Sequence, residues 1–409
     1  MRKKILVFSF LFLFLLGLVL LGNKIYWDYR VRHAIIHVEL SYQVIPVHQE
    51  NVTVDLLIQE INGTLKTNPV IDTSKVGKQE VTFQYINEEK IPLSYTIEVE
   101  IVDTISPLIF QSKSKTVSVG YDSDLEKDLF CGDNYDSNPH CYIEGEYDLN
   151  QIGRYPLTFV GEDSSGNRSS NDFTLIVQAK SNSSGGGGSG GSYTSFSEVK
   201  EKYKGDDVHF GIDISHWQGD INFQKVKDAG VEFVYIRVGR GDGIGADFVE
   251  DRKFQQNIEG FHQVGIPVGV YFYSNANSNQ DAEKEAKWVL KKIKPYHVDL
   301  EIVYDWENWG DFQYYDLSFH QLTETAKTFS KTVSKAGYMG MLYSSKSYLL
   351  SVWDEVDFPK WLAHYTEYTN YTGTYSVWQL CDDGKVDGIS GYVDLDIRYG
   401  DISIKKAVS

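Results

Sequence analysis

The 409-residue sequence predicts a multidomain protein with an N-terminal transmembrane helix, two all-β sandwiches and a C-terminal α/β barrel. Three observations predict this fold class. An uncharged apolar run opens the chain, short strand-like runs fill residues 36–178, and strands alternate with helices from Val208 onward. A formal net charge of −18 argues against a nucleic-acid partner, because phosphate binding needs a basic patch.

The N-terminal segment has the pattern of a membrane anchor. Arg2, Lys3 and Lys4 precede the uncharged run 5–22, which is just long enough to span a bilayer. No small-x-small cleavage motif follows, so we expect an uncleaved single-pass anchor within residues 1–25. The basic residues before the run place the N-terminus in the cytoplasm and the remaining chain outside. Cleavage as a signal peptide is the alternative.

Two similar β-rich modules follow, over residues 36–103 and 104–179. The stretch 72–83 aligns with 148–159, an offset of about 76 residues, and each copy then closes with a further strand. Alternating and β-branched runs between turn signals at this spacing are typical of β-sandwiches.

The second module contains two of the three cysteines. Cys131 and Cys141 are close enough in sequence to pair outside the cell, whereas Cys381 is expected to be free. The loop 131–138 offers oxygen ligands without a recognised calcium spacing, which favours a plain Asx-rich loop over a calcium site. Because the histidines are scattered and no zinc motif occurs, we expect no metal and no cofactor.

Three short motifs characterise the second module: Asp-Thr-Ile-Ser-Pro at 103–107, Gly-Arg-Tyr-Pro-Leu-Thr at 153–158 and Asp-Ser-Ser-Gly-Asn at 163–167. In these motifs the module resembles bacterial immunoglobulin-like surface modules, which implies that both copies are immunoglobulin-like sandwiches acting as spacers. A Gly/Ser-rich linker over 180–196 then marks the clearest domain boundary and leaves 197–409 as the last domain.

From Val208 onward, the strand–helix rhythm predicts a parallel sheet closed into a barrel. After Met339 the sequence predicts short strands without helices between them. The barrel is therefore expected to alternate strands and helices regularly in its first half but not in its second. Reactive groups in such barrels lie where strands end at the carboxyl rim. The side chains at these ends are Asp213, Arg237, Tyr271, Tyr273, Asp305, Glu307, Tyr343, Tyr365, Trp378, Gln379, Asp394 and Asp396.

The pair Asp305 and Glu307 carries the strongest chemical signal. The two residues follow a buried apolar run, and residues two apart on a strand share a face, so Trp306 should point to the other side. Neighbouring carboxylates resist simultaneous ionisation, which makes one a proton donor and the other an anion. Cleavage of a glycosidic bond needs one carboxyl group that donates a proton and a second that carries a negative charge. For the pair taken alone, a strand end with solvated acids is the alternative.

Ordered motifs run through the last domain, at 211–221 (Gly-Ile-Asp-Ile-Ser-His-Trp-Gln-Gly-Asp-Ile), 233–237, 269–273, 305–307, 361–365, 377–379 and 393–395. In these motifs residues 207–403 closely resemble glycoside hydrolase family 25, the lysozyme-like muramidases. The resemblance implies a TIM-like barrel of eight strands and five helices. It also implies peptidoglycan glycan strands as the substrate. Together with the predicted N-terminal anchor, it leads us to expect a bacterial cell-membrane location, with the C-terminal domains extracellular in the cell wall.

The resemblance implies a role for each of four acids. Glu307 would protonate the glycosidic oxygen, and Asp305 would orient and charge-stabilise the N-acetyl group that attacks the anomeric carbon. Asp213 and Asp394 would complete the acidic rim. Assistance by the substrate's N-acetyl group is the preferred mechanism, while a retaining or inverting outcome stays open. Asp396 stands where asparagine is frequent in the family, which leaves the pH optimum open.

The side chains around these acids are candidates for substrate binding, because sugar rings pack on aromatic faces. The predicted set is Tyr273, Tyr365, Trp378, Gln379, Tyr343, Arg237 and Asp396. For Arg237, a structural ion pair with the acids is favoured over a substrate contact. Packing is an equal alternative for three further tryptophans, Trp217, Trp306 and Trp309. His216 and His364 are interpreted as hydrogen-bonding wall residues without a partner that would make either a base.

The leading hypothesis is a membrane-tethered muramidase that cleaves the β-1,4 bond between N-acetylmuramic acid and N-acetylglucosamine. The alternative is a non-catalytic protein of wall-glycan binding or assembly that uses the barrel as a binding module. The presence of all four acids weighs against that alternative. A third hypothesis is an enzyme acting on another N-acetyl polymer such as chitin. The sequence does not indicate protein partners.

Overall fold

The computed structural model describes residues 2–110, 112–126, 128–180, 193–245 and 247–400. The chain forms two compact units, Met1–Thr104 and Ile105–Ser409, so the second β-rich module shares a unit with the barrel. Most of the predicted linker 180–196, and the end of the predicted last domain beyond residue 400, lie outside the described residues.

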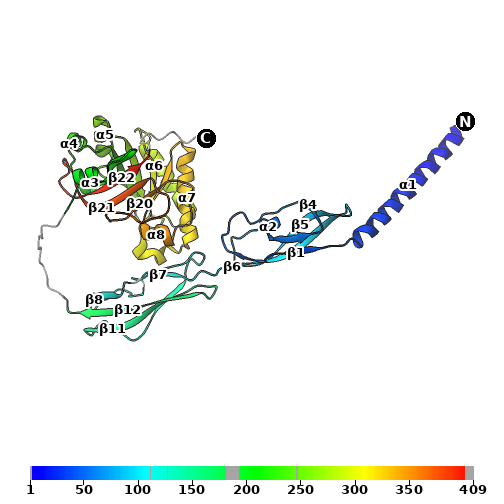
Figure 1. The fold of residues 1–409 in the computed structure, drawn as a ribbon, viewed down its shortest axis with the longest axis horizontal. Helices are drawn as coiled ribbons and strands as arrows, with labels where there is room; N and C mark the ends of the chain where they lie inside the picture. Colours follow the sequence, from blue (N-terminus) through cyan, green and yellow to red (C-terminus); the bar gives the residue numbers. More distant parts are fainter. Residues whose placement is uncertain (1, 111, 127, 181–192, 246, 401–409) are drawn as a thin grey trace. The chain divides into compact units, whose positions relative to one another are not determined.

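The first unit begins with the helix α1 (Arg2–Arg32) (Figure 1). Within it, the segment Phe12–Arg32 is long and apolar enough to cross a membrane by length and composition alone. A signal sequence near an N-terminus passes the same test, so the anchor remains a proposal.

The rest of the first unit is one β-rich module. Its four-stranded sheet has the order β2 (Val44–Pro46), β6 (Pro92–Val102), β5 (Gly77–Asn87) and β4 (Gly63–Leu65). Beside the sheet are the two-stranded ladder of β1 (Val38–Leu40) with β3 (Ile58–Ile61) and the short helix α2 (Val54–Leu57). Strand β2 is parallel to β6, and the other pairs of the sheet are antiparallel.

The second module repeats this topology. Its sheet has the order β8 (Ser114–Ser118), β12 (Arg168–Gln178), β11 (Gly153–Glu162) and β10 (His140–Glu144), and its ladder pairs β7 (Leu108–Phe110) with β9 (Phe130–Gly132). Strand β8 is parallel to β12, as β2 is to β6. The internal repeat is therefore confirmed, and so is the Cys131–Cys141 disulfide, while Cys381 is free and buried.

The predicted immunoglobulin-like sandwiches are wrong. Each module has one four-stranded sheet and a two-stranded ladder, not two facing sheets that share seven strands. Hydrophobic alternation indicates where strands occur, but it does not say how strands are divided between sheets. Here two long hairpins, β5–β6 and β11–β12, take most of the strand-forming residues, and only short segments remain to pair with them.

The last region, from residue 193, contains a closed barrel of eight strands (Figure 1). In sheet order these are β14 (Val208–Ile214), β15 (Phe233–Gly241), β17 (Val268–Tyr273), β18 (Ile302–Asp305), β19 (Gly340–Ser345), β20 (Lys360–Ala363), β21 (Val377–Lys385) and β22 (Val393–Tyr399). Two short strands pair outside this circle, β13 (Thr194–Ser195) with β21 and β16 (Phe248–Glu250) with β15.

The helices of this region are α3 (Phe196–Tyr203), α4 (Phe223–Asp228), α5 (Phe254–Val264), α6 (Asn279–Ile293), α7 (Phe319–Lys335) and α8 (Lys346–Ser351). Two 3₁₀ helices, η1 (His216–Gln218) and η2 (Trp309–Tyr315), follow β14 and β18. Several helices begin at a serine N-cap. Ser318 accepts a hydrogen bond from Gln321 N at the start of α7, and Ser278 does the same for Asp281 N at α6.

The prediction of a TIM-like barrel with eight strands and five helices is wrong in its strand directions and its helix count. Strand β22 is antiparallel to both neighbours, β21 and β14, whereas a TIM barrel is parallel throughout. The physical reason lies in the chain after β20. Within the described residues no helix lies between β20 and β22, and antiparallel neighbours can be joined by a short turn, whereas parallel ones need a long crossover.

The barrel has two apolar layers. Inside it lie Phe233, Tyr235, Val303, Met341 and Trp361, all at most 2 % exposed. A second, larger cluster fills the space between the strands and the helices. Strand alternation assigns the side chains of β18 to these layers, so Val303 and Asp305 face inward while Tyr304 and Trp306 face the helices.

Candidate active site

The candidate site is built around the end of β18. Asp305 is the last residue of the strand and is 4 % exposed, whereas Glu307 is exposed at the rim. Backbone contacts fix this end, because the Ser274 N–H donates to the carbonyl of Asp305 at 2.7 Å. Trp306 is fully buried, and its indole N–H donates to the Ala276 carbonyl at 3.3 Å. The predicted opposition of Trp306 to the acids is confirmed.

The two carboxyl groups of Asp305 and Glu307 interact directly. Burial raises the pKa of Asp305 well above its usual range, and the charge and hydrogen bond of Glu307 raise it further, against the opposing charge of Arg237. Loss of surrounding water also raises the pKa of Glu307, while its hydrogen bond with Asp305 lowers it. The pair therefore titrates as a unit and holds one proton more readily on Asp305 in the free protein.

Three further acids meet beside this pair where β14 adjoins β22. Asp213 lies directly opposite Asp394 in the antiparallel register, and Asp396 is two residues further along β22. Burial and then the charges of Asp394 and Asp396 raise the pKa of Asp213 well above its usual range. Burial, with the charge of Asp382, raises the pKa of Asp394 to about 7.

A network of neutral side chains supports Asp213. The amide nitrogen of Gln379 donates to Oδ2 of Asp213 at 2.8 Å. The amide oxygen of Gln379 accepts from the hydroxyls of Tyr343 at 2.8 Å and Tyr365 at 3.0 Å. Tyr365 is 52 % exposed, whereas Gln379 and Tyr343 are buried, so only Tyr365 of this network offers an open ring at the rim.

Two predicted substrate contacts are corrected by burial. Trp378 is 2 % exposed, and its indole N–H donates to the carbonyl of His364 at 2.9 Å. Neighbouring strand residues face opposite sides, so Trp378 cannot share the inner face of Gln379. Asp396 is 1 % exposed and accepts from the Trp361 indole at 2.8 Å, which places it beneath the rim.

The structure distinguishes exposed from packed residues among the three tryptophans for which packing was an equal alternative. Trp217 is 75 % exposed beside His216, so packing is excluded for it. Trp306 is buried, and Trp309 stacks on Tyr348 with ring centroids 3.7 Å apart, so both are packing residues. Tyr273 lies at the end of β17, with its hydroxyl 3.5 Å from Oδ1 of Asn308.

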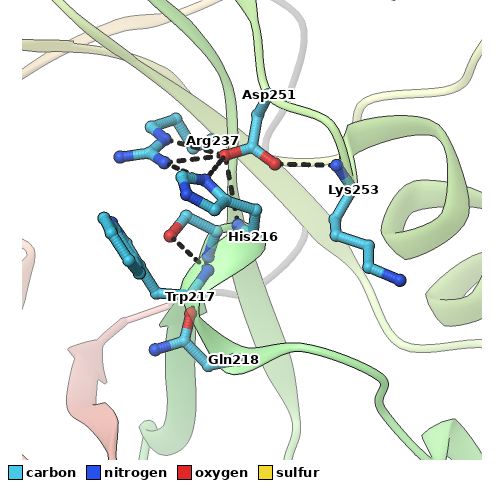
Figure 2. Close-up of polar contacts among 7 residues, drawn as sticks. His216, Trp217, Gln218, Arg237, Asp251 and Lys253 are labelled. Carbon is cyan, nitrogen blue, oxygen red and sulfur yellow. Dashed lines mark hydrogen bonds and ion pairs between the residues drawn. The ribbon is translucent and has the colours of Figure 1, made fainter.

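Arg237 is confirmed as an ion-pair partner, although not of the rim acids. Its guanidinium contacts Oδ2 of Asp251 through Nε at 3.0 Å and through Nη2 at 2.8 Å, as Figure 2 shows. The same oxygen lies 2.9 Å from Nδ1 of His216 and accepts from the His216 backbone N–H at 3.1 Å. The interpretation of His216 as a hydrogen-bonding residue is therefore confirmed, with Asp251 as its partner. Lys253 N donates to the other oxygen of Asp251 at 2.9 Å.

Sequence reasoning missed Asp251. The strand β16 folds back on β15, pairing Glu250 with Gly239, and this hairpin brings the next residue beside Arg237. The dipeptide Asp242-Gly243 between the two strands is a hairpin signal that could have revealed the pairing. Burial raises the pKa of Asp251, but the hydrogen bonds from Lys253, His216 and Arg237 outweigh it and leave the pKa lowered.

A second set of missed residues braces the chain just after Glu307. The side-chain amide of Asn308 donates to the Ser274 carbonyl at 2.9 Å and accepts from Asn275 at 3.2 Å. The carboxyl of Glu285 accepts from the Ser274 hydroxyl at 2.6 Å and from the Asn275 N–H at 3.0 Å. Burial raises the pKa of Glu285 to about 8. No local sequence signal identifies these residues, because they meet only in the folded barrel.

A cavity of about 480 Å³ opens next to Tyr365. Helix α3 forms one side of it, and the segments after β20 and around Asp382 form the other. Asp382 also acts electrostatically on Asp394, so the cavity lies beside the acidic rim.

Comparisons with known proteins agree with this geometry. Residues 212–389, within the barrel region, match the family model described as glycosyl hydrolases family 25. The autolytic lysozyme of Clostridium acetobutylicum is 29% identical over 190 residues, which cover 46% of this chain and 54% of the relative. Lysozyme M1 of Streptomyces globisporus is 28% identical over 202 residues, covering 45% and 65%.

The chain spans about half the length of the first of these relatives. Among solved structures, the modular autolysin LytC from Streptococcus pneumoniae, in complex with a synthetic peptidoglycan ligand, is 27% identical. That comparison covers 59% of this chain and 56% of the other, with a TM-score of 0.43.

Proposed function

We propose that this chain is a membrane-anchored peptidoglycan hydrolase that cleaves the β-1,4 bond between N-acetylmuramic acid and N-acetylglucosamine. The observation that carries the proposal is the hydrogen-bonded pair of Asp305 and Glu307 at the barrel rim, beside Asp213 and Asp394. Its support is the family match over residues 212–389 and the similarity to two lysozymes.

In the proposed reaction Glu307 gives its proton to the glycosidic oxygen as the bond to the anomeric carbon breaks. The carbonyl oxygen of the substrate's N-acetyl group attacks that carbon, and the positive charge that develops lies beside Asp305. Water then opens the cyclic intermediate and returns a proton to Glu307. Glu307 is suited to the donor role because it is exposed at the rim, while Asp305 is buried below it.

The proton must move within the pair when substrate binds. In the free protein Asp305 holds it more readily, because burial raises the pKa of Asp305 more strongly. An N-acetyl N–H that donates to Asp305 would favour the ionised form of Asp305. The shared proton then passes to Glu307, where the leaving oxygen can receive it. Substrate binding thus converts the pair from its resting state into an acid and an anion.

Substrate positions follow from exposure around the pair. Tyr365, which is half exposed, and Trp217, which is largely exposed, are the proposed aromatic platforms for sugar rings. Gln379 and Tyr343 act through Tyr365 and Asp213 by holding them in place. The cavity beside Tyr365 is the proposed continuation of the glycan path.

We also propose that α1 anchors the chain in a bacterial cell membrane, with the later modules extracellular in the wall. The support is its apolar segment Phe12–Arg32 and the lysines and arginine before it. Protein sequencing of the chain from membrane fractions should find an intact N-terminus. A mature N-terminus between residues 20 and 30 would contradict the anchor.

The direct test of the chemistry is Glu307→Gln, which preserves shape but cannot donate a proton. Turnover of purified peptidoglycan should fall by at least about 100-fold, while binding to insoluble peptidoglycan stays near the wild-type level. Glu283→Gln, on α6, is the matched control and should keep full turnover, because Glu283 is half-exposed and its ion-pair partner is Lys287 of the same helix. A Glu307→Gln variant that retains more than about a tenth of the activity would be incompatible with a general acid at this position.

A further inference from the structure

The second β-rich module packs against the barrel through the strand β9 (Phe130–Gly132), here called the docking strand. Phe130 is 9 % exposed and belongs to the same apolar cluster as the barrel helices. Its ring centroid lies within 6.4 Å of four aromatic rings of the barrel region: Phe312 at 5.6 Å, Tyr348 at 5.9 Å, Phe319 at 6.2 Å and Trp309 at 6.4 Å. The contact is thus a continuous aromatic core.

Backbone hydrogen bonds continue the contact at the start of α7. The Phe319 N–H donates to the carbonyl of Asp133 at 2.8 Å, and the His320 N–H lies 3.4 Å from the carbonyl of Asn134. The first N–H groups of a helix have no partner within the helix. The module therefore completes the first turn of α7, a task that a freely moving spacer could not perform.

The docking strand reaches the site through η2. Trp309, only two residues after Glu307, stacks on Tyr348 and packs edge to face on Trp306. Phe130 lies against Trp309 and Phe312, the first and fourth residues of η2. On the opposite side, Asn308 binds the Ser274 carbonyl. The segment that carries Glu307 is consequently held between the β17–α6 loop and the second module.

The packing leaves no free space at Gly132. A Cβ added there would lie 2.5 Å from the Phe319 ring and 2.7 Å from the Phe312 ring. The backbone of Gly132 is in a region that any residue can adopt, so glycine is needed here for close approach and not for conformation. An added methyl group would act as a wedge between the module and the barrel.

We propose that residues 105–179 are a fixed part of the catalytic unit, in which the docking strand holds η2 and thereby keeps Glu307 in position. Phe130 is then a positioning residue that acts through Trp309 and Phe312. The inference rests on the proposed function for the role of Glu307, but the docking itself rests on the contacts above. It replaces the expectation that this module is only a spacer.

The position of Glu307 matters most when the bond breaks, so displacement should lower kcat more than it raises KM. The proposed sugar platforms, Tyr365 and Trp217, belong to segments of the barrel region other than η2. A shift of about 1 Å in a catalytic group can lower turnover by about 100-fold. The pH profile should change as well, because the shared proton depends on the contact between Asp305 and Glu307.

The experiment compares Gly132→Ala with Gly153→Ala in the full chain. The control also adds one methyl group to the same module, but the three atoms nearest to its Cβ all belong to the side chain of Tyr155, two residues along the same strand, the nearest at 3.2 Å. Turnover of purified peptidoglycan is measured across pH, together with amide hydrogen exchange in Trp309–Tyr315. Gly132→Ala should lower kcat by about 10- to 100-fold with KM nearly unchanged, and should speed exchange in η2. Gly153→Ala should match the wild type.

A second pair of variants covers the case in which Gly132→Ala does not fold. Phe130→Ala should lower kcat and speed exchange in η2 as Gly132→Ala does. Phe130→Leu keeps most of the apolar contact, so its kcat should stay within about threefold of the wild-type value. The inference would be overturned if Gly132→Ala and Phe130→Ala both had the same kcat, the same pH profile and the same exchange rate in η2 as the wild type. If the wild-type chain releases no glycan fragments, the proposed function fails, and η2 exchange alone then supports or overturns the docking.

Discussion

The two β-rich modules share a topology but not a role. Each has a hairpin, a parallel strand beside it and a two-stranded ladder, and equivalent hairpins begin at Gly77 and Gly153. The first module belongs to a compact unit of its own with α1, whereas the second belongs to the unit of the barrel. A repeated fold therefore does not imply a repeated function.

The difference lies in the second strand of each ladder. In the first module β3 reads Ile-Gln-Glu-Ile, and its two central residues are exposed. In the second module β9 reads Phe-Cys-Gly, and all three residues are buried. The first ladder has exposed Gln59 and Glu60 in this strand, whereas the second has an aromatic residue, a disulfide-bonded cysteine and a glycine. The aromatic residue and the disulfide add apolar area, and the glycine allows close approach, so the second ladder can form an interface.

The stability of the two units should depend on pH in different ways, which is the largest effect we expect. Glu285 and Asp394 have folded-state pKa values of about 8 and about 7, above their unfolded values. The folded barrel thus binds more protons than the unfolded chain, so its stability is greatest below about pH 4.5 and falls by several kcal/mol towards pH 8. Asp55 and Asp72 of the first unit have lowered pKa values, because hydrogen bonds from Thr53 and Ser74 favour the charged form. Their contribution is lost only below about pH 4.

Urea unfolding at several pH values measures this difference. Every tryptophan after Trp27 lies between Trp217 and Trp378, so tryptophan fluorescence follows the barrel. Its urea midpoint should decrease from pH 5 to pH 8, while protection of peptides from residues 38–102, followed by mass spectrometry, stays constant over this range. A barrel midpoint that rises with pH would show that the buried acids do not carry raised pKa values.

Reduction of the disulfide should give a smaller effect, confined to the unit that contains the second module and the barrel. Cys131 lies in the docking strand, and its bond to Cys141 closes a short loop. Losing that bond should lower the free energy of unfolding by about 3 kcal/mol, because the unfolded chain regains the entropy of the open loop. The first module has no cysteine and serves as the internal control. Urea midpoints with and without reductant measure the effect. Free alkylation of both thiols in the native, unreduced chain would contradict the account.

The sequence predicted which acids meet at the candidate site better than it predicted the architecture around them. Asp305 and Glu307 could be paired because a two-residue period is local, and the Cys131–Cys141 disulfide follows from short spacing. The direction of β22 could not be predicted, because it depends on a closing contact with β14, almost two hundred residues earlier in the chain. The same holds for Asp251 and Glu285, whose partners are supplied by other strands and helices.

Burial was the other property that sequence patterns left open. Trp378 and Gln379 are neighbours on one strand, and their identities alone do not say which of them faces the barrel interior. The structure turns Gln379 inward to Asp213 and Trp378 outward to Tyr203, with ring centroids 5.7 Å apart. Only the assembled barrel separates the exposed aromatic Tyr365 from the packed aromatic Trp378.

The central claim is that Asp305 and Glu307 cut peptidoglycan after N-acetylmuramic acid. Mass spectrometry of the fragments released by the full chain from purified peptidoglycan, after reduction of their new ends with borohydride, tests this most directly. We predict reduced N-acetylmuramic acid at the new ends with the wild-type chain and almost none with Glu307→Gln. New ends of N-acetylglucosamine, or equal release by Glu307→Gln, would contradict the account.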